Sequence, residues 1–202
     1  MPTSRSIEAI VKDQYTRFYT LDDSVAFKTT AEYFLRQATR SKKKELKAES
    51  KQAWLRGMQK RLLIGIGCEL LLKSYFLMSG FCINKPILAI ATKPPYRIQD
   101  INLSDFDFSA TYSMYNLLEQ LPKIGRFNNH NKIMRGFRIA RVFRDNEGHA
   151  PVYWHMFNPQ NYRDIESALT SFYPEAFSQS FKIQFAIQKG EKSIFDVEEM
   201  KS

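Results

Sequence analysis

Apolar residues recur every three or four positions along five stretches of this chain, which is the spacing of one face of an α-helix. The first stretch follows Asp22, Asp23 and Ser24, whose short polar side chains are typical of a helix N-cap. We therefore predict helices over 25–39, 48–79, 110–121, 129–145 and 162–172.

The most apolar part of the chain, 62–81, carries apolar residues on almost every side of its predicted helix. It is long enough to span a bilayer, but Glu69 and Lys73 lie near its middle, and each charge costs about 2.5–3.5 kcal/mol at the centre of a spanning helix. A helix that is apolar all round is otherwise surrounded by other helices. We interpret 48–79 as the central helix of a bundle, terminated by Gly80, and expect no membrane partner.

Two stretches depart from the helical pattern. Residues 82–109 contain three prolines, which break helices, so we predict an insertion there between two helical hairpins. Apolar residues alternate with polar ones from 181 to 187, which predicts a strand or hairpin at about 180–196. The predicted fold is mainly α: a single domain over 1–202, an antiparallel four- to five-helix bundle with an inserted loop region and a small C-terminal β appendage.

The chain is basic, since 30 Lys and Arg outnumber 21 Asp and Glu for a formal charge of +9. Such a surplus favours polyanionic partners such as nucleic acid. The hydrophobic content of 44% excludes a disordered chain. Only two cysteines are present and the N-terminus lacks the apolar stretch of a signal peptide, so we expect a reducing, cytoplasmic location.

The candidate chemistry lies at the end of the fourth predicted helix, in the run Arg144-Asp145-Asn146-Glu147-Gly148-His149. Arg144 falls on the apolar face of that helix, where a cation is costly unless an anion meets it. We expect the chain to leave the helix at Gly148, which would let His149 turn back towards the guanidinium. A guanidinium that holds a phosphate beside an imidazole that moves a proton suits phosphodiester chemistry.

The spacing alone leaves a plainer alternative open, in which Arg144 forms a salt bridge near the helix end and His149 is a solvated loop residue. A zinc site formed by Cys68, Cys82, His149 and His155 lacks the usual ligand spacing. We therefore predict neither a metal nor another cofactor.

The run from Arg144 to His149 resembles the R-x4-6-H signature of the HEPN superfamily, in the form with a polar residue directly after the arginine. The segment LLIGIGCELLLKSYFLMSG is similar to the second helix of that superfamily, with Glu69, Leu70 and Lys73 matching an E-L-x-x-K pattern. The segment SMYNLLEQLPKI resembles the helix between the two. The resemblance covers about 50–80 and 110–175, and it does not explain the insertion or the C-terminal tail.

This resemblance implies a small helical bundle that dimerises and brings two R-x4-6-H motifs into one cleft. Many HEPN domains are metal-independent endoribonucleases of toxin–antitoxin and phage-defence systems. By that analogy, His149 would act on the RNA 2′-hydroxyl or on the leaving oxygen, Arg144 would stabilise charge on the phosphate, and Asp145 or Asn146 would orient the histidine. The expected activity is RNA cleavage through 2′-hydroxyl attack, which leaves DNA intact.

Glu69 has two alternative partners in the sequence: it could hold Arg144 across the bundle, or pair with Lys73 one helical turn away.

Some HEPN toxins are silenced by a nucleotidyltransferase that modifies a tyrosine two residues past the histidine, whereas Tyr153 lies four residues past His149. This departure from the pattern speaks against that modification here, so an antitoxin or nucleotidyltransferase partner is implied by the resemblance alone. The rival reading is a non-catalytic HEPN module that binds RNA, a nucleotide or a partner protein.

Residues 123–144 contain seven Lys and Arg and no acid, which predicts an RNA-binding surface. Two aromatic residues shortly after the motif could stack RNA bases, although core or dimer contacts are the commoner role for such residues. The candidate RNA-binding residues are Arg135, Arg138, Arg141, Tyr153 and Trp154.

Overall fold

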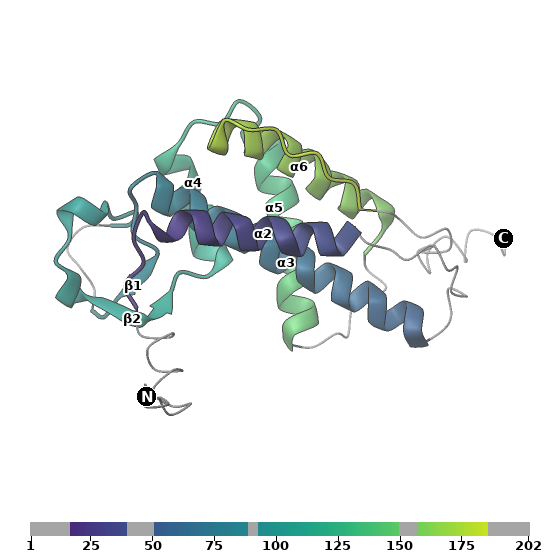
Figure 1. The fold of residues 1–202 in the computed structure, drawn as a ribbon, viewed down its shortest axis with the longest axis horizontal. Coiled ribbons are helices and arrows are strands. Elements are labelled where there is room, and N and C mark those ends of the chain that lie inside the picture. The colour runs from purple at the N-terminus through teal and green to yellow at the C-terminus, as the bar shows by residue number, and fades with distance from the viewer. Residues whose placement is uncertain (1–16, 40–50, 89–92, 150–156, 186–202) are drawn as a thin grey trace, which may run out of the picture.

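The computed structural model describes residues 17–39, 51–88, 93–149 and 157–185, with the backbone alone at 51–54 and 147–149 (Figure 1). These described residues form five α-helices and one small antiparallel sheet, so the prediction of a mainly helical fold is confirmed. None of the described helices combines the length and the apolar character that crossing a membrane requires.

Every stretch with helical periodicity forms a helix in the structure. The bounds are α2 Asp23–Thr39, α3 Lys51–Met78, α4 Met114–Ile124, α5 His130–His149 and α6 Pro159–Phe177. The largest differences from the predicted segments are in α6, which is longer at both ends, in α4, which begins four residues later and ends three residues later, and in α5, which continues to His149. Element types therefore followed from the sequence more closely than their ends did.

Local sequence explains where several helices begin and end. Gly80 follows α3 with φ of +78°, a conformation that glycine adopts without strain. The Phe81 amide donates to the Phe76 carbonyl at 2.8 Å and the Gly80 amide to the Leu77 carbonyl at 3.0 Å, the pair of bonds that closes a Schellman motif. The prediction that Gly80 terminates the central helix is confirmed.

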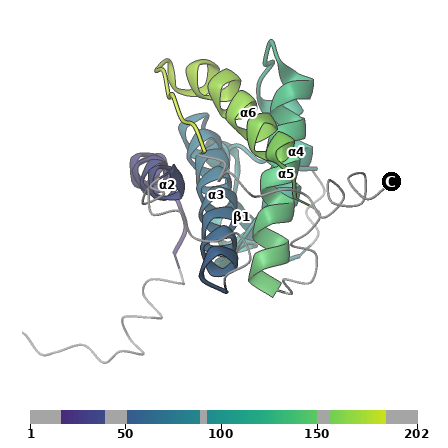
Figure 2. The same ribbon diagram turned by 90° about the vertical axis from the view of Figure 1, so that its right-hand side faces the viewer.

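Helix α3 is the centre of the fold. Helix α2 runs antiparallel to it, and α5 crosses it steeply on the opposite side (Figure 1). Figure 2 shows α2, α3 and α5 side by side, with α6 packed on α5. This arrangement explains why α3 is apolar all round, as predicted: its Ile64, Cys68, Leu71 and Leu72 are fully buried.

Two glycines allow the helices to approach closely where they cross. A Cβ at Gly65 on α3 would lie 2.5 Å from the Arg144 Cβ and 2.8 Å from the Ala140 carbonyl oxygen on α5. A Cβ at Gly136 on α5 would lie 2.3 Å from the Ala168 Cβ on α6. Real side-chain atoms do not approach this closely. A side chain at either glycine would therefore push the two helices apart. The first crossing places the backbone of Arg144 against α3.

The sheet that the described residues form lies at the insertion. Strands β1 Asn84–Pro86 and β2 Phe106–Thr111 pair antiparallel. The buried side chain of Asn84 accepts from the Tyr19 amide at 3.1 Å and donates to the carbonyls of Arg17 (3.2 Å) and Asp107 (3.1 Å), which ties the start of the described chain to the sheet.

The predicted C-terminal strand is not formed by the described residues 181–185, and the rest of its range, 186–196, lies outside the described part. The alternation has another cause: Phe181 and Phe185 are buried against the bundle while Lys182 and Gln184 are exposed. The ring of Phe181 stacks on Tyr173 of α6 at 4.8 Å. An extended segment laid on a helix buries every second residue as a strand does, without a partner strand.

Candidate functional site

Arg144 lies where α5 crosses α3, and its guanidinium reaches an acid on the neighbouring helix. Its Nε is 2.8 Å from the Glu69 Oε2, while 36% of the side chain stays exposed. Glu69 follows Gly65 by one turn of α3, so the close crossing and the ion pair share one face of that helix. Glu69 therefore provides the negative charge that Arg144 needs on the apolar face of α5.

Glu69 contacts a second cation as well. The Lys73 Nζ lies 2.9 Å from the Glu69 Oε1 and donates to the Thr111 hydroxyl of β2 at 3.0 Å. The Glu69 side chain is 7% exposed and that of Lys73 12%. Glu69 therefore pairs with both of the partners that the sequence offered, Arg144 and Lys73. Because the carboxylate is buried, solvent and salt screen these ion pairs less than they would screen a pair at the surface.

The two residues after Arg144 differ in their surroundings. The carboxylate of Asp145 lies 3.4 Å from Nη1 of Arg144 and 3.8 Å from Nε of Arg141, so it faces arginines. The amide nitrogen of Asn146 is buried and has no hydrogen-bond partner among the described residues. Asp145 therefore extends the ion-pair cluster from α3 to the preceding turn of α5.

The expectation that the chain leaves the helix at Gly148 is wrong, because α5 continues through His149. One glycine costs a helix only about 1 kcal/mol, whereas Pro151 disfavours helical geometry at the residue before it. Positions five residues apart on one helix are separated by about 140° around its axis. Positions 144 and 149 therefore lie on different sides of α5, and the imidazole of His149 lies outside the described side chains.

The arginines that precede the motif have different partners. Arg135 pairs with Asp164 of α6, with 2.9 Å from Nε and 2.8 Å from Nη2 to the same carboxylate oxygen. The guanidinium of Arg141 lies 5.1 Å from the ring centre of Tyr115 on α4. Arg138 is exposed and has no ion-pair or hydrogen-bond partner within the described part of the chain. Tyr153, Trp154 and His155 lie outside the described residues.

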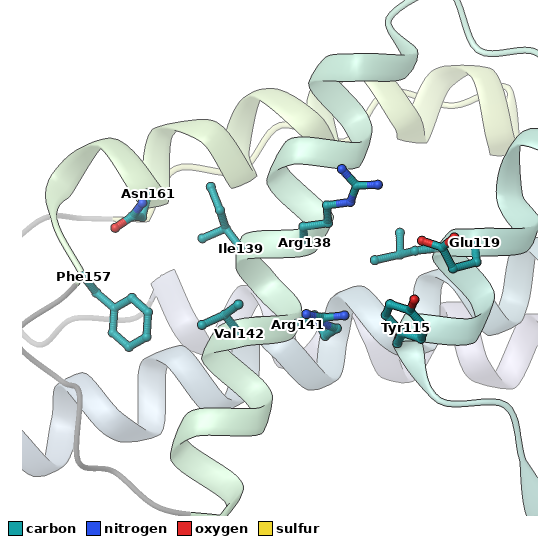
Figure 3. A pocket seen from close by; sticks show the side chains of 9 residues that line it. Tyr115, Glu119, Arg138, Ile139, Arg141, Val142, Phe157 and Asn161 are labelled. Atoms are coloured by element: carbon teal, nitrogen blue, oxygen red, sulfur yellow. The ribbon is translucent and has the colours of Figure 1, made fainter.

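A pocket of about 420 Å³ lies between α4, α5 and the start of α6 (Figure 3). Its apolar floor comes from α5, with Arg138 and Arg141 beside Tyr115 and Glu119 at one end, and Phe157 and Asn161 at the other. Apart from the two arginines, sequence reasoning missed this pocket. The available signal was the apolar Val142 among the charged positions of α5; it is 43% exposed and lines the pocket.

Both thiols are structural, because they are fully buried. Burial raises the pKa of Cys68 far above its ordinary value and that of Cys82 to about 12, so neither is a thiolate near neutral pH. Among the described residues, no group of three or more histidine, cysteine or acidic side chains is placed to hold a metal ion.

Comparison with known proteins gives no information on the function of this chain. No family model, no curated protein and no solved structure matches this chain.

Proposed function

We propose that this protein is a metal-independent endoribonuclease with Arg144 and His149 as its catalytic residues. The observation that carries the proposal is the anchored guanidinium of Arg144. Nε lies 2.8 Å from Glu69 and Nη1 lies 3.4 Å from Asp145, while Nη2 has no hydrogen-bond partner within the described residues and the side chain remains partly exposed. An arginine fixed in this way can bind a phosphate oxygen at little further entropic cost.

The proposed reaction is an internal transesterification of RNA. The 2′-oxygen forms a bond to the adjacent phosphorus, its proton goes to a base, and the bond from phosphorus to the 5′-oxygen breaks as that oxygen takes up a proton. His149 serves as the base or as the acid, since an imidazole exchanges protons near neutral pH. Arg144 stabilises the charge that develops on the phosphate oxygens.

We further propose that the active unit is a homodimer. Positions 144 and 149 lie on different sides of α5, so one chain does not bring both to one point by helix geometry alone. A second copy of this helix end, related by a two-fold axis, would supply the complementary set of groups. The HEPN resemblance places paired motifs in such a cleft, which agrees with this arrangement.

Charge supports RNA as the substrate. Helix α5 presents Arg138 and Arg141 within two turns before Arg144, and the formal charge of the chain is +9. Basic side chains that track a phosphate backbone are the main source of affinity for nucleic acid. The protein would act as a toxin or anti-phage effector, with an antitoxin or nucleotidyltransferase as its regulatory partner.

The test is cleavage of end-labelled RNA by the full chain with excess chelator present. We expect products that end in 2′,3′-cyclic phosphate, no cleavage of DNA or of 2′-O-methyl RNA, and loss of activity in His149→Ala and Arg144→Gln. His130→Ala, on the first turn of the same helix, is the matched control and should retain activity. In cells, expression should arrest growth unless His149 is replaced.

Two results would contradict the proposal. RNA that is bound but left intact by the dimeric protein would identify a non-catalytic module instead. Cleavage that His130→Ala and His149→Ala reduce equally would point to a general effect on folding or to a contaminating nuclease.

A further inference from the structure

The pocket between α4, α5 and α6 has two chemically different ends. Val142 and Ile139 form an apolar floor, and Phe157 closes one end beside Asn161 (Figure 3). Arg138 and Arg141 mark the other end, next to the ring of Tyr115, which is 52% exposed. A ligand that matches this lining is flat and apolar at one end and anionic at the other.

Polar groups in the pocket have hydrogen-bonding capacity that the described chain does not use. The Arg141 Nε is buried without a hydrogen-bond partner among these residues, its nearest acid being the carboxylate of Asp145 at 3.8 Å. Arg138 has no described partner either. The Asn161 side-chain oxygen accepts from the Asn158 amide at 2.8 Å, which leaves its NH₂ group without a partner in the described chain. The buried Nε of Arg141 favours an occupant that brings an acceptor, and the more exposed donors of Arg138 and Asn161 are free to bind the same occupant.

From these contacts, we infer that the pocket binds one nucleotide unit of single-stranded RNA, with its base on the floor formed by Ile139 and Val142 and its phosphate at Arg138 and Arg141. A volume of about 420 Å³ is within the range of small-molecule sites. The NH₂ of Asn161 donates to an acceptor on the base edge. The carboxylate of Glu119, at the arginine end, accepts from a ribose hydroxyl.

A continuous set of charges joins this pocket to the proposed active site. Asp145 contacts Arg141, which lines the pocket, and Arg144, which faces Glu69. The nucleotide in the pocket would therefore flank the phosphate held by Arg144. This last step rests on the proposed function, whereas nucleotide binding by the pocket does not.

The test is the affinity of the full chain for a fluorescently labelled single-stranded RNA, measured by anisotropy, with His149→Ala as the background to prevent cleavage. Val142→Glu places a carboxylate on the apolar floor of the pocket and should weaken binding at least about tenfold, because the base would then bury an unpaired charge and the phosphate would face a like charge. Val25→Glu makes the same change at an exposed position of α2 and is the matched control. Arg138→Gln is compared in the same way with Arg126→Gln, outside the pocket.

Equal affinities for Val142→Glu and Val25→Glu would overturn the inference, whether or not the protein cleaves RNA. Loss of affinity in Val142→Glu alone supports it, even if the wild-type protein proves inactive, and in that case only the proposed function fails. Free adenosine and guanosine monophosphates are titrated in parallel. Binding of these with no binding of RNA would overturn the assignment to an RNA strand.

Discussion

The Arg144 guanidinium and the Glu69 carboxylate lie 2.8 Å apart at the crossing of α5 and α3. The carboxylate is nearly buried and also contacts Lys73 on its other oxygen. The Arg144 guanidinium is therefore held in place by a residue of α3, so this helix contributes to the proposed site. The first two predictions follow from this relationship.

Replacing Glu69 by glutamine removes the negative charge that Arg144 and Lys73 share. We expect the free energy of unfolding to fall by about 1–3 kcal/mol, between the values for an exposed ion pair and for a buried one, and RNA cleavage to be lost. Urea unfolding and the cleavage assay measure the two effects. Asp164→Asn is the control, because Arg135, its partner, is 67% exposed and that pair should contribute at most about 1 kcal/mol. Equal losses in both variants would contradict a special role for Glu69.

Replacing Gly65 by alanine tests the close approach of α3 and α5. The new methyl group would lie 2.5 Å from the Arg144 Cβ, so the helices must separate, at a cost of about 1–3 kcal/mol. Gly57→Ala in the same helix is the control, since a Cβ there meets only the end of the Arg61 side chain, at 3.2 Å. Thermal and urea unfolding should show Gly65→Ala destabilised and Gly57→Ala unchanged or stabilised by up to about 1 kcal/mol. The reverse order would exclude tight packing at this crossing.

Glu166 provides a test of pH dependence. Burial raises its pKa, although the amide of Phe185 donates to its carboxylate and opposes the shift. A raised pKa in the folded state means that the carboxyl contributes stability below its unfolded pKa, about 4.3, and that this contribution is lost as pH rises through the folded value. Glu166→Gln should therefore gain stability relative to the wild type between pH 4 and pH 7. Urea unfolding of both proteins at the two pH values measures the difference, and a pH-independent difference would contradict this account.

The buried thiols give a fourth prediction. Since burial raises the pKa of Cys82 to about 12 and that of Cys68 further, iodoacetamide at pH 8 should modify neither residue in the folded protein. Both should react within minutes in concentrated urea. Mass spectrometry after quenching gives the count, and rapid modification of either thiol in the native state would show that its part of the core opens.

The sequence predicted some elements well because their signals are local. Periodicity placed all five described helices, and Gly80 marked the end of α3 because a backbone with positive φ favours glycine. The predicted end of α5 lies four residues before the observed one, because a helix tolerates a single glycine at a cost of about 1 kcal/mol. At 181–185 the alternation was real, but burial on a helix and pairing in a sheet produce the same pattern.

By itself, the sequence determined the helical class, the approximate extent of each described helix, and the candidate pair of Arg144 and His149. Only the tertiary structure decided that Glu69 contacts both Arg144 and Lys73, that the small sheet lies in the insertion, and that α4, α5 and the start of α6 line an open pocket. The physical reason is the range of the interactions. Helix formation depends on neighbours within a turn or two, whereas ion pairs, sheet partners and pockets depend on which distant surfaces pack together.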